Sequence, residues 1–113
     1  MADFLYHITA KEEWSQCDHE YLPTGFHKEG FIHCSYCEQI VGSANKFFHG
    51  QRNLVLLQIN PAKITSSIVD ENLEGGEMMF PHIYGPLPVD AVVQEIDFPC
   101  ENDGSFRLPQ QIK

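Results

Sequence analysis

Histidine is the residue best suited to do chemistry in this chain, which has six histidines among 113 residues. Three of them stand beside bulky neighbours in extended segments: His7, His33 and His82. A neutral imidazole both donates and accepts hydrogen bonds, and it exchanges its proton near neutral pH. These three residues are therefore candidates for ligand binding or acid–base catalysis, although a strand histidine can also be purely structural. The others are interpreted as solvated residues of loops or a helix end: His19, His27 and His49.

Ser35 stands two residues after His33, on the same face of an extended segment. Ser35 and Glu38 have the spacing of a capping box, so Ser35 is expected to begin the main helix. The free N–H groups and the dipole of a first helical turn attract a phosphate or a carboxylate. If the strand of His7 pairs with the strand of His33, both histidines would point into one cleft. The residues expected to line this cleft are His7, His33, Ser35, His82 and Tyr84. The alternative is that Ser35 only caps the helix.

Residues 80–86 read Phe-Pro-His-Ile-Tyr-Gly-Pro. Two prolines and a glycine shape the backbone around His82 and Tyr84. A rigid backbone around polar aromatic side chains suits a preorganised site, and it also suits an ordinary tight loop. We take His82 as the candidate general acid or base, with His33 and Tyr84 as its catalytic neighbours in the cleft.

The cysteines offer other chemistry: Cys17, Cys34, Cys37 and Cys100. Cys34 and Cys37 form a Cys-x2-Cys pair, but a structural zinc site needs a second pair, which the sequence lacks. We therefore expect no metal. A redox pair, or a cysteine nucleophile activated at the helix N-terminus, stays open as an alternative. The chain shows no secretory leader, so we expect a reducing cytoplasm and free thiols.

The charge of the chain disfavours several classes of partner. A net charge of −9, with seven Lys plus Arg, repels nucleic-acid backbones and anionic membranes. We therefore expect a small-molecule ligand, no general nucleic-acid binding and no membrane association, while a single phosphate group stays compatible. A hydrophobic content of 42% supplies one core. The acidic residues after position 70 are interpreted as a solvated turn: Glu71, Glu74 and Glu77.

Hydrophobic periodicity predicts the elements that must position these residues. Strands or extended segments are predicted at 4–9, 30–34, 54–59, 64–69, 78–85 and 90–98, with a short strand at 105–108. A short helix is predicted over 11–16 with Thr9 as its N-cap, and residues 17–29 are expected to be a loop. The main helix is predicted over about 36–48, with one apolar stripe for burial: Ile40, Val41, Ala44, Phe47 and Phe48. This pattern favours a single α+β domain over residues 1–113, with mostly antiparallel strands.

Taken together, these segments resemble DUF952, a bacterial family of unknown function. The resemblance rests on Phe-Leu-Tyr-His-Ile-Thr at 4–9, Glu-Gly-Phe-Ile-His-Cys-Ser at 29–35, Glu-Gln at 38–39, Leu-Val-Leu-Leu at 54–57, Phe-Pro-His-Ile-Tyr-Gly-Pro-Leu at 80–87 and Asp-Gly-Ser-Phe-Arg-Leu-Pro at 103–109. The similar segments cover nearly the whole chain in the order of the family. The family has no established activity.

A more distant similarity relates residues 6–9, Tyr-His-Ile-Thr, to the Tyr-His-Gly-Thr of ADP-ribosyltransferases and RNA 2′-phosphotransferases. The resemblance implies an ADP-ribosyltransferase-like split sheet around a nucleotide cleft, with NAD or an ADP-ribose-like ligand as cofactor. It implies that His7, Thr9 and Ser35 contact this ligand. Ile8 stands where the transferases commonly have glycine, and His82 stands where many have a catalytic glutamate. Ligand binding is therefore implied more directly than ADP-ribosyl transfer.

The leading hypothesis is a domain that binds a nucleotide or another phosphorylated small molecule in a histidine-lined cleft, with ADP-ribosyl- or phosphotransferase-like chemistry. Two rivals stay open. One is an enzyme that works without NAD, such as a hydrolase or isomerase. The other is a non-catalytic interaction module whose histidines are structural.

Overall fold

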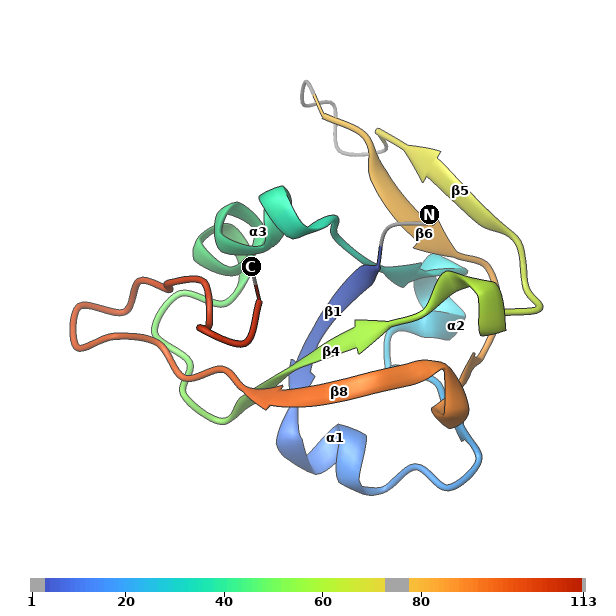
Figure 1. The fold of residues 1–113 in the computed structure, drawn as a ribbon, viewed down its shortest axis with the longest axis horizontal. Helices are drawn as coiled ribbons and strands as arrows, with labels where there is room; N and C mark the ends of the chain where they lie inside the picture. The colour runs from blue at the N-terminus through green and yellow to red at the C-terminus, as the bar shows by residue number, and fades with distance from the viewer. Residues whose placement is uncertain (1–3, 73–77, 113) are drawn as a thin grey trace.

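Three antiparallel strands cross the middle of the molecule (Figure 1). The computed structural model describes residues 4–72 and 78–112. The central sheet has the order β1 (Leu5–Ala10), β4 (Leu54–Ile59), β8 (Val92–Asp97). Its middle strand, β4, is the one with a nearly continuous apolar run, which is typical of a strand buried on both faces.

The two faces of this sheet pack into two separate cores, because side chains alternate along each strand. One face sends alternate residues of β1 and β4 into the first core: Tyr6, Ile8, Leu54 and Leu56. Helix α3 (Ile40–Phe47) and the C-terminal segment close this core through Ile40, Ala44, Phe106 and Ile112. The other face sends the intervening residues into the second core: Leu5, Val55, Leu57 and Ile59.

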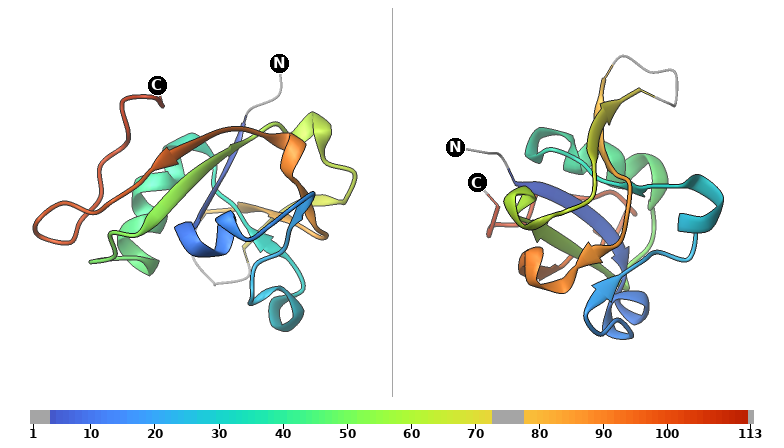
Figure 2. Two further views of the ribbon diagram at one scale, coloured as in Figure 1. Left: turned by 90° about the horizontal axis from the view of Figure 1, so that it is seen from below. Right: turned by 90° about the vertical axis from the view of Figure 1, so that its right-hand side faces the viewer.

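A second sheet lies against the second core, in the order β3 (Ile32–His33), β6 (Phe80–Ile83), β5 (Ile68–Glu71). Its strands are antiparallel, and its β5–β6 pair projects away from the central sheet (Figure 2). A short pair of strands, β2 (Glu20–Tyr21) and β7 (Leu87–Pro88), completes the second core. An isolated bridge between Tyr6 and Ser35 connects β1 to the segment that follows β3.

The remaining elements are short: α1 (Lys11–Ser15), α2 (Phe26–Glu29) and 3-10 turns at Cys37–Gln39, Pro61–Lys63 and Val89–Ala91. The predicted α+β class with antiparallel sheets is confirmed. Among the helices described, none is long and apolar enough to cross a membrane.

Several predicted boundaries were wrong. Residues 17–29 are not all loop, because Tyr21 pairs with Leu87 and is 1% exposed. The strand predicted at 64–69 forms later, at Ile68–Glu71, where it pairs with β6. Residues 105–108 form no strand, because Phe106 inserts into the first core and its N–H donates to the side chain of Asn45.

The predicted cap at Ser35 was also wrong, because Ser35 belongs to the bridge with β1. Its N–H donates to the carbonyl of Tyr6 at 2.7 Å, and its hydroxyl lies 3.1 Å from that of Ser43. The helical segment begins one residue later, at Tyr36, whose N–H donates to the side chain of Gln39 at 2.9 Å. Ser35 therefore does not offer the helix N-terminal anion site that its spacing indicated.

Candidate functional site

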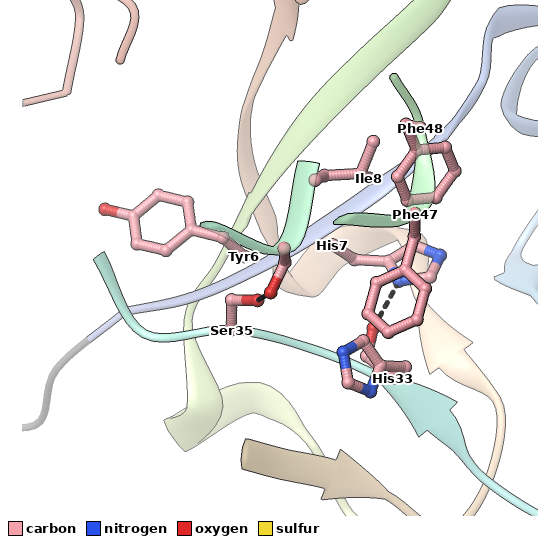
Figure 3. Close-up of a pocket in the computed structure, with 8 residues that line it drawn as sticks. Tyr6, His7, Ile8, His33, Ser35, Phe47 and Phe48 are labelled. Atoms are coloured by element: carbon pink, nitrogen blue, oxygen red, sulfur yellow. Dashed lines mark hydrogen bonds between the residues drawn. The ribbon is translucent and has the colours of Figure 1, made fainter. Parts of the chain in front are cut away.

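A small cavity opens where β1, the segment after β3 and helix α3 meet (Figure 3). Its volume is about 60 Å³, and it is lined by Tyr6, His7, Ile8, His33, Ser35, Ser43, Phe47 and Phe48. Phe47, predicted to be buried, is 44% exposed and contacts the His33 ring edge-on at 5.9 Å between centroids. Within the described part of the chain, no lysine, arginine, aspartate or glutamate lines this cavity.

His33 begins a hydrogen-bonded chain that runs away from the cavity. Its Nδ1 lies 3.2 Å from Nε2 of His82, the residue opposite it in the β3–β6 register. Nδ1 of His82 lies 2.9 Å from Oε1 of Glu71 on the neighbouring strand β5. The hydroxyl of Tyr84 donates to the same carboxylate oxygen. We call His33, His82, Glu71 and Tyr84 the Glu71 chain.

The carboxylate at one end of the Glu71 chain decides where the protons lie. An ionised carboxylate only accepts hydrogen bonds, so Nδ1 of His82 must carry the proton that it shares with Glu71. When His82 is neutral, its Nε2 is then an acceptor, and Nδ1 of His33 must donate to it. A neutral His33 therefore carries its lone pair on Nε2, a buried atom, and this lone pair is what a base uses.

The surroundings of the Glu71 chain favour this arrangement. Hydrogen bonds from Tyr84 and then from His82 lower the pKa of Glu71, so the carboxylate is ionised at neutral pH. The same contact with Glu71 raises the pKa of the Tyr84 hydroxyl, which keeps its proton and remains a donor. The ring of Phe31 stacks on His82, with centroids 4.0 Å apart and an interplanar angle of 13°, so packing fixes the imidazole plane.

His7 belongs to a second chain, which lies on the other side of the His33 backbone. Its Nδ1 lies 2.7 Å from the carbonyl oxygen of His33, which can only accept, so Nδ1 donates. Its Nε2 lies 3.0 Å from the hydroxyl of Tyr21, and that hydroxyl lies 2.8 Å from the hydroxyl of Thr9. Thr9 was predicted to cap α1, but Ala10 takes that position and Thr9 contacts Tyr21 instead. We call His7, Tyr21 and Thr9 the His7 chain.

Burial holds His7 neutral, because it lowers the pKa of the imidazole to about 4. Burial also raises the pKa of Tyr21, so its hydroxyl is protonated; it donates to Oγ1 of Thr9 and lies 3.0 Å from Nε2 of His7. Both ring nitrogens of His7 are thus engaged by protein groups. His7, which sequence reasoning assigned to a ligand, holds the backbone of His33 through its Nδ1 hydrogen bond and also lines the cavity.

The structure brings three of the six predicted site residues to one cavity: His7, His33 and Ser35. The others lie outside its lining. His82 stands behind His33 in the Glu71 chain, Tyr84 lies at the far end of that chain, and Thr9 lies in the His7 chain.

Sequence reasoning missed Glu71, Tyr21 and Ser43. Glu71 was interpreted as part of a solvated turn, which was wrong because it lies in β5 and accepts from His82. Glu74 and Glu77 of that turn lie outside the described residues. One signal was available for Ser43: it falls on the face of α3 that also carries the buried residues Ile40 and Ala44.

The cysteines do not contribute to this site. All four are free thiols. Burial raises the pKa of Cys34, which is the opposite of what activates a cysteine nucleophile. Within residues 4–72 and 78–112, no group of three metal-ligating side chains is close enough to hold a metal ion.

The fold and the site thus define a small α+β domain in which two histidine-centred chains meet beside one cavity. The chain belongs to the DUF952 family, described as a protein of unknown function, whose family profile matches residues 8–95. The crystal structure of protein CC0527 from Caulobacter crescentus is 33% identical, covers 96% of this chain and 97% of its own, and superposes with a TM-score of 0.84.

The solution NMR structure of the same Caulobacter crescentus protein superposes with a TM-score of 0.80, over 96% of this chain and 95% of its own. No curated protein matches this chain. Neither the family description nor these structures names an ADP-ribosyltransferase, so that resemblance stays a prediction.

Proposed function

We propose that this domain binds a small molecule in the cavity beside His33 and performs general acid–base chemistry on it, with His33 as the base. The observation that carries the proposal is the continuous hydrogen-bond chain from Glu71 through His82 to His33, which ends at the cavity. A base whose proton position is set by a hydrogen-bonded partner, itself oriented by a third group, is a recurring arrangement in enzymes.

Electrostatics supports the same role. When Nε2 of His33 takes a proton, the imidazolium is connected through His82 to the negative charge of Glu71. A carboxylate in that position stabilises the charged form of the base. The hydrogen bond from His7 to the carbonyl of His33 holds the backbone of the base in place, and the neutral His7 adds no positive charge beside it.

Long-range proton–nitrogen NMR of the histidine rings tests the proposal without knowledge of the substrate, because it separates protonated from unprotonated ring nitrogens. We expect neutral His33 to carry its proton on Nδ1 and to have an unprotonated Nε2 atom. A proton on Nε2 of neutral His33 would overturn the proposal, since the basic lone pair would then point along the chain and not be available to a ligand.

A fragment screen by NMR tests binding in the same cavity. We expect shifts that cluster at Ser35, Ser43 and Phe47, and a binding affinity that changes with the protonation of His33. The variant His33→Gln should abolish that pH dependence. His19→Gln is the matched control, because His19 is exposed and lies in neither chain. Fragment shifts confined to other surfaces would contradict the proposal.

A nucleotide is the second candidate ligand, and one observation favours it. The bridge between Tyr6 and Ser35 sets His7 and Ser35 on adjacent backbone segments, and both line the cavity, as the sequence resemblance implies for a ribose. A cavity of about 60 Å³ admits only part of a dinucleotide, because pockets for whole small molecules occupy roughly 300 Å³ or more. Titration with NAD, ADP-ribose and a ribonucleotide 2′-phosphate tests this ligand class. Shifts at His7, Ser35 and His82 would support it, and their absence would leave a smaller ligand as the candidate.

A further inference from the structure

A pair of buried serine hydroxyls faces the same cavity as His33. Oγ of Ser35 lies 3.1 Å from Oγ of Ser43, and the two residues are 4% and 5% exposed. Two hydroxyls carry two hydrogens, and only one is used between them. In the described part of the chain, neither side chain has a second hydrogen-bond partner, so one O–H donor remains. Buried polar groups usually find a partner, so this donor points to a ligand acceptor.

The other walls indicate what kind of acceptor fits. Ile8, Phe47 and Phe48 make the cavity largely apolar, and no charged side chain other than a protonated histidine lines it in the described residues. An ionised ligand would lose its hydration there without gaining a fixed counter-charge. A neutral oxygen acceptor on a small apolar molecule fits both the uncharged apolar walls and the remaining serine donor.

From this layout we infer that the substrate class is a small uncharged carbonyl compound, and that the serine pair binds its oxygen while His33 removes a proton from the adjacent carbon. This inference rests on the proposed role of His33 as a base. The C–H bond breaks, its proton moves to Nε2 of His33, and its electron pair forms the C=C bond of an enolate. The negative charge moves to the oxygen, where the serine donor stabilises it. Return of the proton to carbon regenerates the base.

This layout gives Ser43 a chemical role in addition to its place on the buried face of α3. The backbone N–H and carbonyl of Ser35 are both used in the bridge with Tyr6, so only its hydroxyl can bind a ligand. Ser43 accepts or donates one hydrogen bond to that hydroxyl and so determines which of the two serines presents its hydrogen to the cavity. Ser43 therefore either binds the oxygen itself or positions Ser35 to bind it.

The test is hydrogen–deuterium exchange at the carbons next to the carbonyl group. The full chain is incubated in D2O with acetone, butanone or propionaldehyde, and proton NMR follows the loss of the exchangeable C–H signals. We expect exchange faster than in buffer alone, reduced to the buffer rate in His33→Gln. Ser43→Ala should slow exchange by about a hundredfold, the loss typical when one oxyanion donor is removed.

Ser15→Ala is the matched control, because Ser15 is an exposed serine of α1 whose hydroxyl donates to the carbonyl of Glu12. Exchange at the buffer rate in wild type, with Nε2 of His33 unprotonated, overturns the carbonyl inference and leaves the base intact. Equal exchange in wild type and Ser43→Ala overturns the role of the serine pair. A proton on Nε2 of neutral His33 overturns the base itself. Since alanine is a good helix former, Ser43→Ala is expected to fold, and its amide NMR spectrum verifies this.

Discussion

The His7 chain and the Glu71 chain meet at one residue, His33. Each chain is built around a histidine, but the first contacts the backbone of His33 and the second contacts its ring. In the His7 chain the histidine itself contacts only a carbonyl and a hydroxyl, the chain reaches the Glu13 carboxylate only through a 3.5 Å contact from Thr9, and the pKa of His7 is about 4. The Glu71 chain ends on a carboxylate whose side chain is 22% exposed.

The difference shows that burial and the group in direct contact with the imidazole decide what each chain can do. The buried imidazole of His7 stays neutral because the loss of hydration on burial outweighs the hydrogen bond to the His33 carbonyl, which raises its pKa. A carboxylate partner fixes the tautomers along the Glu71 chain and supplies a countercharge. This contrast supports the proposal that His7 holds the backbone and that His33 carries the chemistry.

Removal of His7 should have the largest effect on stability. His7→Leu leaves the carbonyl of His33 and the hydroxyl of Tyr21 without their present partner, at a cost of about 3–4 kcal/mol in the free energy of unfolding. Urea denaturation measures this loss. His7→Asn retains a donor near the position of Nδ1 and should lose less; equal losses in the two variants would argue against the role of the carbonyl contact.

The pH dependence of stability should be the next largest effect. The pKa of His7 is about 4 in the folded protein against an ordinary value of 6.5, so between these values only the unfolded chain takes up the proton. Stability from this residue is complete above pH 6.5 and falls as the pH decreases, approaching a loss of about 3 kcal/mol near pH 4. Denaturation of wild type and His7→Asn across this range isolates the effect, and parallel curves would show that His7 is not the group responsible.

Two substitutions at His82 separate its contact with Glu71 from its contact with His33. Each should lower the free energy of unfolding by about 2 kcal/mol. His82→Asn keeps a donor near the position of Nδ1 for Glu71 but removes the acceptor for His33, so the two neutral tautomers of His33 should become mixed. His82→Gln keeps an amide near the position of Nε2 and should preserve more of the His33 tautomer. Nitrogen NMR of the His33 ring distinguishes them, and an unchanged tautomer in both variants would show that His82 does not control it.

Tyr84→Phe should have the smallest effect. It removes the hydrogen bond that contributes most to the low pKa of Glu71, so that pKa should rise toward its usual range while global stability changes by less than about 1 kcal/mol. Carbon NMR titration of the Glu71 carboxyl measures the shift. Tyr36→Phe is the control, because it removes a similar hydroxyl from Asp70 on the same strand and should leave the pKa of Glu71 unchanged.

Elements with a strong hydrophobic pattern were predictable from the sequence. The continuous apolar run of β4 and the alternation of β1 appear at nearly the predicted positions. The failures have a common cause: short elements are set by tertiary pairing. Tyr21 has no local strand pattern and becomes β2 only because Leu87 pairs with it. Ser35 satisfied a capping spacing, but the bridge to Tyr6 overrode it.

The candidate site was predictable in its residue types and not in its connections. The predicted cleft assumed that the strands of His7 and His33 pair, but β1 pairs with β4 and meets the segment after β3 only in the Tyr6–Ser35 bridge. His7, His33 and Ser35 still line one cavity, whereas His82 and Tyr84, which were expected in the same cleft, lie outside it. Nothing in the local sequence indicated that Glu71 would be brought beside His82, since this depends on the register of β5 against β6. An acidic turn and a strand that carries a functional carboxylate have similar compositions.

The central sheet has a consequence for how the molecule folds and unfolds. Strand β4 sends Leu54 and Leu56 into one core and Val55 and Leu57 into the other, so the two cores share a single backbone. Neither core can lose its packing while β4 stays fully supported, which favours one cooperative transition over a stepwise one. The two histidine chains, which meet at His33, should therefore disappear together when the protein melts.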